Sequence, residues 1–279
     1  MGCQSGMLST RAVIVVPLYR EFMSAAEEFS LRHSLEVLSA YDFFVICPSE
    51  LLNYASRIRR DYLASFHIQT FPSKYFSSVK GYNGLLMSKE FYRQFERYEY
   101  ILIVQTDALV FADQLEEWCD RDYSYIGAPW FEGHTRPKKP LSFAGVGNGG
   151  FSLRKVSDAI RVLESSLFGA PENGRVRLGI EEKFRLSSLI LHCIALSSSP
   201  PFVTLEVNED IYWGAVAPLR HNWFVVPPAE AAVDFAFEVA PEYMFELNGE
   251  RLPFGCHAWE RYNPEFWRER ARDIGLELP

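Results

Sequence analysis

The sequence predicts one α/β domain with a mostly parallel central sheet and helices on both faces of the sheet. Between residues 11 and 104, short apolar segments alternate with segments of helical periodicity, which is the pattern of a parallel sheet. The chain has 279 residues and 48% hydrophobic content, enough for one large core. It contains no internal repeat and no low-complexity segment. We therefore expect a single domain over residues 11–279, preceded by a flexible N-terminus at residues 1–10.

In the first half of the chain, a buried strand is expected before each helix. Strands are expected at residues 11–17, 41–47, 66–69 and 100–104, and helices at residues 21–38, 51–59 and 83–98. The side chains expected to face the core are Phe22, Ala25, Ala26, Phe29 and Leu35 in the first helix, and Leu85, Leu86, Phe91, Tyr92 and Phe95 in the last.

In the second half of the chain, expected strands and helices alternate less regularly. Residues 125–130 predict a short edge strand. Residues 131–145 form a polar loop that is long enough to cover a site, although solvated surface loops commonly have this composition. A strand from Phe151 and a helix over residues 156–165 follow, and residues 181–196 predict a further helix.

Composition and charge exclude several classes of protein. The net charge of -8 and the absence of a Lys/Arg block argue against a nucleic-acid partner. The five cysteines are odd in number and form no C-x-x-C pair, which favours a reducing compartment over a disulfide framework or structural zinc. The start of the chain lacks the pattern of a secretory signal, and no apolar run approaches the length of a membrane span. We expect a soluble cytoplasmic protein.

The most informative segment is the apolar run 100–104, which ends abruptly in Gln105, Thr106 and Asp107. On an extended backbone the side chains of Gln105 and Asp107 leave the same face. A carboxylate and an amide at the carboxyl end of a strand suit a divalent metal or a sugar hydroxyl, and open α/β sheets bind ligands at that end. An Asp in this place is also typical of a simple turn after a core strand.

A glycine-rich segment, Gly147-Asn148-Gly149-Gly150, precedes the strand that begins at Phe151. Glycines permit close approach of a ligand to the backbone and leave its amide donors accessible. The segment does not match G-x-G-x-x-G at the start of a helix, and the chain has no P-loop motif, so dehydrogenase and P-loop nucleotide folds lose support. A tight hairpin or bulge explains these four residues equally well.

Two acids and a late histidine complete the candidate motifs. Glu209 and Asp210 follow Asn208 and precede an aromatic run, so they suit either the first turn of a helix or a general base that accepts the proton of a hydroxyl. His257 lies among small and aromatic residues near the end of the chain. A single histidine is more often structural than a ligand, but these neighbours indicate a turn that faces a pocket.

The order of these four motifs resembles the GT-A glycosyltransferases. In that fold an acidic metal-binding motif ends a strand, a glycine-containing loop follows, an acidic segment supplies the catalytic base, and a C-terminal histidine completes the metal site. The resemblance is closer to a group of glycosyltransferase-like proteins from bacterial polysaccharide clusters, mostly without an assigned substrate. It covers roughly residues 11–262 and is carried by residues 80–83, 88–92, 98–107, 125–130 and 147–155.

The resemblance implies transfer of a sugar from a nucleotide sugar, most simply a UDP-sugar, to a hydroxyl of a glycan or lipid-linked glycan. It implies a nucleotide-binding half at residues 11–111 and an acceptor-binding half at residues 112–279. Attack by a base-activated acceptor inverts the anomeric centre. Peripheral association with the inner face of a membrane would suit a lipid-linked acceptor.

The resemblance also implies roles for individual residues. Asp210 would be the base, with Glu209 as its alternative. Asp107, His257 and Gln105 would hold Mn²⁺ or Mg²⁺. The nucleotide would contact Pro17, Tyr19, Lys80, Asn83 and Thr106, and the donor or acceptor sugar would contact Asn148, Gly149, Gly150, Trp130 and Trp259.

Gln105 departs from the pattern of the wider fold, which usually has an aspartate at this position. Weaker metal binding in the absence of nucleotide is the expected consequence, and metal-independent transfer stays open. Gln105 also keeps open a non-catalytic carbohydrate-binding protein with a degenerate transferase site. A nucleotidyltransferase is a second alternative, although the chain has no Gly/Arg/Lys-rich loop after its first strand to clamp a triphosphate.

Overall fold

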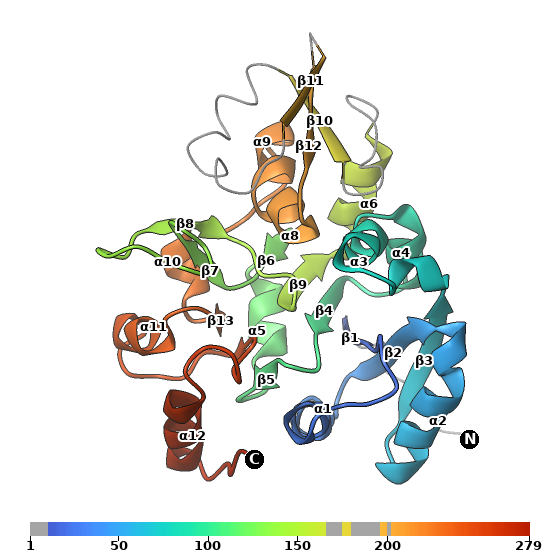
Figure 1. Ribbon diagram of the computed structural model, residues 1–279, viewed down its shortest axis with the longest axis vertical. Helices are drawn as coiled ribbons and strands as arrows, with labels where there is room; N and C mark the ends of the chain where they lie inside the picture. The colour runs from blue at the N-terminus through green and yellow to red at the C-terminus, as the bar shows by residue number, and fades with distance from the viewer. Residues whose placement is uncertain (1–10, 166–174, 180–195, 200–201) are drawn as a thin grey trace, which may run out of the picture.

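A six-stranded sheet lies at the centre of the computed structural model, which describes residues 11–165, 175–179, 196–199 and 202–279 (Figure 1). The strands run in the order β3-β2-β1-β4-β9-β6. Their bounds are β1 Ala12–Pro17, β2 Asp42–Pro48, β3 Phe66–Phe71, β4 Tyr100–Val104, β6 Tyr125–Ile126 and β9 Phe151–Lys155. The first four are parallel to one another, and β9 is antiparallel to both of its neighbours. The predicted α/β class with a mostly parallel sheet is confirmed.

The strand order reverses at β1. The chain passes outward from β1 to β2 and β3, and then returns to place β4 on the other side of β1. In open α/β sheets, ligands bind outside the carboxyl ends of the strands at such a reversal. Because β9 is antiparallel to β4, the residues before β9 lie at the same edge as the residues after β4. The backbone N–H of Gln105 accordingly donates to the carbonyl oxygen of Gly150 at 2.8 Å.

Helices cover both faces of this sheet (Figure 1). Ile14 and Val16 of β1 pack with one set of helices, and the alternate residues Val13 and Val15 pack with the other. The first set comprises α1 Ala25–Val37, α2 Leu52–Asp61 and α5 Leu115–Asp120, and the second comprises α3 Val79–Leu86, α4 Lys89–Gln94 and α6 Val156–Glu164. This two-sided packing explains why the predicted strands are almost uniformly apolar.

The helix expected at residues 21–38 begins later, because Ser24 caps it. The Ser24 hydroxyl accepts the Glu27 N–H at 3.1 Å, and the Glu27 carboxylate accepts the Ser24 N–H at 2.8 Å, which is a capping box. Phe22 therefore lies before the helix and is 76% exposed. The expectation that Phe22 and Ala25 face the core is wrong, because Ala25 is exposed as well.

The long helix expected at residues 83–98 is two helices, α3 and α4. The Ser88 hydroxyl accepts the Phe91 N–H at 3.2 Å and caps α4, so a local side-chain bond replaces continuation of the helix. The five side chains expected to be buried here are buried: Leu85, Leu86, Phe91, Tyr92 and Phe95.

Three smaller sheets accompany the central one. Their strands are β13 Ala236–Phe237, β14 Gly255–Cys256 and β5 Leu109–Val110 in the first, β7 Pro129–Phe131 and β8 Phe143–Val146 in the second, and β10 Arg175–Gly179, β12 Phe202–Glu206 and β11 Leu196–Ser199 in the third. The edge strand expected at residues 125–130 is divided between β6 and β7. Most of the helix expected at 181–196 lies outside the described residues, as does the N-terminal segment 1–10, and Leu196 begins β11.

Most of the remaining helical elements are short. They are η1 Ser49–Leu51, η2 Ser73–Tyr75, α8 Glu209–Ile211, η3 Tyr212–Val216, α9 Ala217–Arg220, α10 Ala229–Ala232, α11 Pro241–Leu247 and α12 Pro264–Asp273. The segment from α8 through the π-helical turn η3 to α9 is continuous, and π-helical turns are frequent at functional sites.

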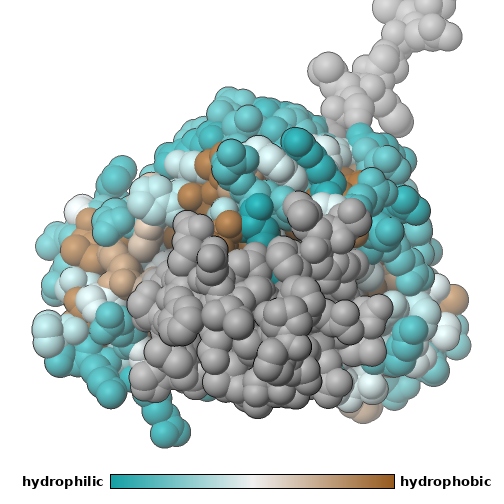
Figure 2. Space-filling model, turned by 90° about the horizontal axis from the view of Figure 1, so that it is seen from above, coloured by the Kyte–Doolittle hydropathy of each residue, from teal (hydrophilic) through white to brown (hydrophobic). Residues whose placement is uncertain are grey.

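Within the described parts of the chain, no helix combines the length and apolar character needed to cross a bilayer. Figure 2 looks onto the end of the molecule that carries β11 in Figure 1. The coloured surface there is mostly hydrophilic, and apolar residues are confined to small patches.

Candidate functional site

A pocket of about 460 Å³ opens at the carboxyl ends of β1 and β4, where the strand order reverses. The predicted site residues that line it are Tyr19, Asn83, Gln105, Asn148, Gly149, Gly150, Glu209, Asp210 and His257. Asp107 does not line the pocket, but its carboxylate contacts His257. The four motifs of the sequence thus meet at one place in the fold.

The small sheet β13-β14-β5 brings the histidine to this place. His257 follows β14 and Glu238 follows β13, and these two strands are parallel. Asp107 lies two residues before β5, which is antiparallel to β14. Strand ends of this kind share one edge, so the three side chains converge. Sequence reasoning missed Glu238, because only the pairing of β13 with β14 distinguishes it from other surface acids.

The imidazole of His257 is held between acidic and amide oxygens. Its Nδ1 lies 3.1 Å from Glu238 Oε1, and its Nε2 lies 3.2 Å from Gln105 Oε1 and 3.3 Å from Asp107 Oδ1. Burial lowers the pKa of His257, but hydrogen bonds to Asp107 and Glu238 outweigh burial and raise the pKa to about 10. Burial in turn raises the pKa of Asp107, and the interaction with His257 outweighs it, so that the pKa of Asp107 is lowered.

The same atoms fit a divalent cation. Imidazole nitrogen, amide oxygen and carboxylate oxygen are all ligands of such ions, and His257 Nε2 lies within 3.3 Å of the oxygens of Gln105 and Asp107. His257 would bind the ion as the neutral imidazole. Asp107 Oδ1 is buried, and its one contact of this kind among the described residues is with His257. Glu238 would orient the ring through Nδ1, as carboxylates do behind metal-bound histidines. No group of three or more His, Cys, Asp or Glu side chains is placed to hold a metal within the described residues, so the amide of Gln105 would complete this set.

The glycine turn packs directly against the functional side chains. A Cβ on Gly150 would overlap the His257 ring, and a Cβ on Gly149 would overlap the Glu209 carboxylate. Asn148 adopts a positive φ of 65°, and its Oδ1 accepts the Gly150 N–H at 3.1 Å. Its Nδ2 is buried without a hydrogen-bond partner. The turn therefore joins the histidine side of the pocket to the acidic side and presents one unpaired donor.

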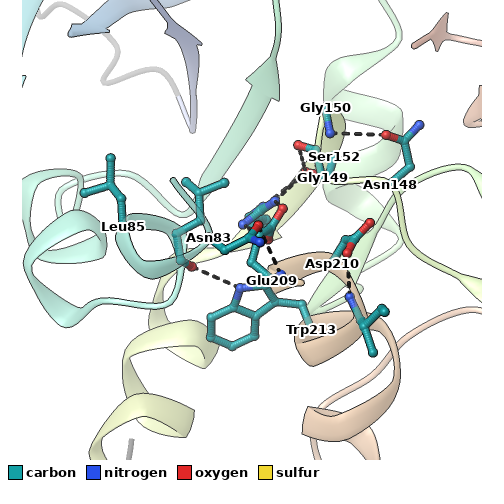
Figure 3. Close-up of polar contacts among 12 residues, drawn as sticks. Asn83, Leu85, Asn148, Gly149, Gly150, Ser152, Glu209, Asp210 and Trp213 are labelled. Atoms are coloured by element: carbon teal, nitrogen blue, oxygen red, sulfur yellow. Dashed lines mark hydrogen bonds and ion pairs between the residues drawn. The ribbon is translucent and has the colours of Figure 1, made fainter. Parts of the chain in front are cut away.

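The adjacent acids Glu209 and Asp210 begin α8 and have different surroundings (Figure 3). Glu209 is buried and forms an ion pair with Arg154 at 2.8 Å. Asp210 lines the pocket, and Figure 3 draws it with a dashed line to the backbone N–H of Ile211, which its Oδ1 accepts at 2.8 Å. Burial, followed by the charge of Glu209, raises the pKa of Asp210 to about 7.

The other wall of the pocket carries three aromatic side chains, of which the sequence indicated only Tyr19. Phe76, Ser77, Ser78 and Val79 at the start of α3 line it, together with Tyr82. Tyr19, after β1, completes this wall and is 41% exposed. No spacing or motif marks residues 76–79, because they form the turn into a helix.

Residues 65–257 match a family described as a protein of unknown function, DUF5672. The chain belongs to this family. The DUF5672 match includes the strand-end triplet, the glycine turn and the paired acids, and it ends at His257. A comparison with curated proteins found no match.

Several solved structures are similar to this DUF5672 protein at low identity. Mouse xyloside xylosyltransferase 1 has 10% identity and a TM-score of 0.48, over 88% of this chain and 96% of that one. Core-mannan synthase A from Aspergillus fumigatus has 11% identity and a TM-score of 0.39, over 53% and 60% of the two chains. The mannosyltransferase PcManGT from Pyrobaculum calidifontis, in complex with GDP-Man and Mn²⁺, has 14% identity and a TM-score of 0.38, over 58% and 48%.

The match thus spans less than two thirds of the length of the mannan synthase and of the mannosyltransferase. Identities and TM-scores this low do not carry an activity over to the present chain.

Five residues predicted to contact substrate lie outside the pocket. Pro17 is buried at the end of β1, and Lys80 is exposed on α3 and is not among the residues that line the pocket. The Thr106 hydroxyl is buried and donates to Glu27 at 3.0 Å. Trp130 packs against Gly147. Trp259 is 0% exposed and donates its indole N–H to Ser30 at 3.1 Å. The expectation of a sugar contact at Trp259 is wrong, because its ring fills the core beneath α1.

Proposed function

We propose that the protein is a GT-A-type glycosyltransferase that moves a sugar from a nucleotide sugar, most simply a UDP-sugar, to a hydroxyl of a glycan or lipid-linked glycan. One observation carries this proposal. A carboxylate with a pKa near neutrality, Asp210, shares one pocket with the metal-type cluster of His257 and Gln105. Sugar transfer needs a base for the acceptor hydroxyl, which Asp210 would supply, and stabilisation of the charge on the leaving diphosphate, which the cluster would supply.

The donor would lie with its nucleotide along the aromatic wall of Tyr19, Phe76 and Tyr82. Aromatic rings stack on a base, and Asn83 at the same wall offers an amide. The sugar would then reach the glycine turn, where Asn148, Gly149 and Gly150 line the pocket. In this arrangement the wall at residues 76–79 contributes to the nucleotide site in place of the predicted Pro17 and Lys80.

The charge of the pocket supports a divalent cation at the diphosphate. Three carboxylates line the described part of the pocket, Glu209, Asp210 and Glu238, and His257 is the titratable base among its described lining residues. A diphosphate in these surroundings requires positive charge. We propose that Asp107, Gln105 and His257 hold Mn²⁺ or Mg²⁺, which when bound neutralises charge on the departing diphosphate.

Asp210 would act as the base. Its carboxylate takes the proton of the acceptor hydroxyl as that oxygen bonds to the anomeric carbon, and the bond from this carbon to the diphosphate breaks. Attack from the side opposite the leaving group inverts the anomeric centre. Glu209 is the weaker candidate, because its carboxylate is engaged by Arg154.

The test combines calorimetry with a screen of nucleotide sugars. The parent protein should bind UDP more tightly with Mn²⁺ than with EDTA, and should hydrolyse one nucleotide sugar slowly without an acceptor. Asp107→Ala should remove metal-assisted binding and turnover. Asp210→Asn should keep binding and remove turnover, whereas Asp61→Asn, at an exposed Asp of α2, should change neither.

Two results would contradict the proposal. Saccharide binding without any nucleotide or metal dependence would indicate a non-catalytic carbohydrate-binding protein. Release of pyrophosphate from a nucleoside triphosphate, with no release of UDP from any sugar donor, would indicate a nucleotidyltransferase.

A further inference from the structure

A fully buried ion pair lies directly behind the candidate base. Arg154 of β9 and Glu209 of α8 pair at 2.8 Å, with side chains 1% and 4% exposed. The other donors of the guanidinium are satisfied, because Nε and Nη2 donate to the Ser152 hydroxyl at 3.1 and 3.0 Å and Nη1 donates to the Tyr92 hydroxyl at 3.3 Å. The guanidinium thus holds Glu209 through a hydrogen-bonded network inside the core.

Stability alone is a weak reason for such a pair. Removing two charges from water offsets much of their attraction, and apolar residues of similar volume often replace a buried pair without loss of stability. The position of Arg154 and Glu209 is more informative than their attraction, because Glu209 contacts separate walls of the pocket.

Two contacts and one covalent link connect Glu209 to the walls of the pocket (Figure 3). Its backbone N–H donates to Asn83 Oδ1 of α3 at 3.4 Å. Its Oε1 lies where a Cβ on Gly149 would be, so the carboxylate supports the glycine turn. Asp210 follows it directly on the short helix α8. A change in the place of Glu209 therefore changes the place of Asp210 relative to both the nucleotide wall and the turn.

The pair also separates the roles of two adjacent carboxylates. Glu209 has the guanidinium as its counter-ion, whereas no cation contacts Asp210 among the described residues. The charged and titratable groups that act on Asp210 are Glu209 on its own helix, Arg154 on β9, Glu238 after β13 and Tyr125 on β6. Two of these groups are negatively charged, so together with burial they raise the pKa of Asp210 above that of an ordinary carboxyl group.

We propose that Arg154 and Glu209 are positioning residues, which hold the Asp210 carboxylate at the pocket surface and keep a negative charge beside it. This inference rests on the proposed function in one respect, the role of Asp210 as the base. The placement and titration of Asp210 can be measured without any substrate.

The first experiment measures Asp210 directly. Carboxylate carbon-13 shifts are followed against pH in Asp-labelled protein, and the Asp210 signal is assigned by its loss in Asp210→Asn. Glu209→Gln keeps the volume and removes the negative charge, so the Asp210 midpoint should fall by about one pH unit. Arg154→Lys keeps the positive charge and should leave the midpoint within about 0.3 unit. An unchanged midpoint in Glu209→Gln would overturn the proposal.

The second experiment separates positioning from folding. The double variant Arg154→Met/Glu209→Met replaces the pair by apolar residues and should stay folded. The plateau kcat should fall about 10- to 100-fold, as when other supporting residues of a site are lost, while the KM for the donor and the affinity for UDP with Mn²⁺ stay close to the parent values. The single variant Arg154→Lys, which keeps the positive charge, should retain most of the parent kcat.

The matched control is Arg93→Met/Glu164→Met, which removes an ion pair of the same length on the exposed surface between α4 and α6 and should leave kcat unchanged. A parental kcat in the core double variant would overturn the positioning role. If no nucleotide sugar is turned over by any form, the proposed function fails, and the Asp210 titration still decides whether Glu209 acts on Asp210.

Discussion

The imidazole of His257 lies against the backbone of Gly150, with no room for a side chain between them. Gly150 is also the residue whose carbonyl oxygen accepts the N–H of Gln105. The glycine turn is thus the spacer that sets the distance between the end of β4 and the histidine. Its glycines are explained by packing around the site as well as by access for a ligand.

Gly150→Ala is expected to displace the His257 ring. A Cβ at this position would overlap the ring, so Nε2 would move away from Gln105 and Asp107. Calorimetry should show at least about a tenfold loss of Mn²⁺-dependent UDP affinity, in the range of other losses around metal sites. Gly84→Ala is the control, because a Cβ there meets nothing closer than 4.0 Å and Ala favours a helix. Equal affinity in both variants would refute this account of the turn.

Gln105→Asp is expected to tighten metal binding. The Gln105 side chain faces His257 Nε2, and a carboxylate there adds a charged oxygen ligand beside Asp107. Titration with Mn²⁺ in the absence of nucleotide should show about a tenfold or greater gain in affinity. Gln94→Asp, at the exposed end of α4, should leave the affinity unchanged. A loss of affinity in Gln105→Asp would place the metal elsewhere.

The pH profile of turnover should carry the signature of Asp210. A base must be ionised, and the pKa of Asp210 is raised to about 7, so turnover should rise with pH through about 7 and level off above it. A profile already flat from pH 5 upward would exclude Asp210 as the base. Rates should be measured with saturating donor, so that changes in binding do not contribute.

The titration of Asp210 should also make the free energy of unfolding depend on pH, and this free energy should fall with rising pH where turnover rises. At pH values between the ordinary pKa of an aspartate and about 7, Asp210 is protonated in the native state and ionised in the unfolded state. The free energy of unfolding therefore falls as the pH rises through this range. Asp210→Asn removes the effect. In urea unfolding the variant should match the parent near pH 4 and exceed it by about 1–3 kcal/mol at pH 8. Equal stability at both pH values would mean that Asp210 titrates normally.

Trp259→Phe should weaken the fold and spare the pocket. The indole N–H donates to the Ser30 hydroxyl, and the ring is fully buried. Loss of this bond should lower the free energy of unfolding by about 1–3 kcal/mol, since a buried acceptor is left unpaired. UDP affinity with Mn²⁺ should be unchanged. If the variant lost UDP affinity but unfolded with the same free energy as the parent, Trp259 would belong to the binding site after all.

The sequence by itself determined the layered architecture and the strand-end location of the site. Continuous apolar runs such as Ala12–Pro17 and Tyr100–Val104 can be satisfied only between two layers of helices, and the polar residues after Val104 mark the open edge. These are local signals, because they depend on the period of burial along one segment.

Tertiary structure alone decided which residues share the pocket. The pairing of β13 with β14 brings Glu238 to His257. Arg154 forms an ion pair with Glu209, and Asp210 stays at the surface of the pocket. The Trp259 ring is buried in the core. Each of these outcomes depends on contacts between segments distant in the chain, and the local pattern of a lone acid or aromatic residue is the same whether it faces a ligand or a neighbouring helix.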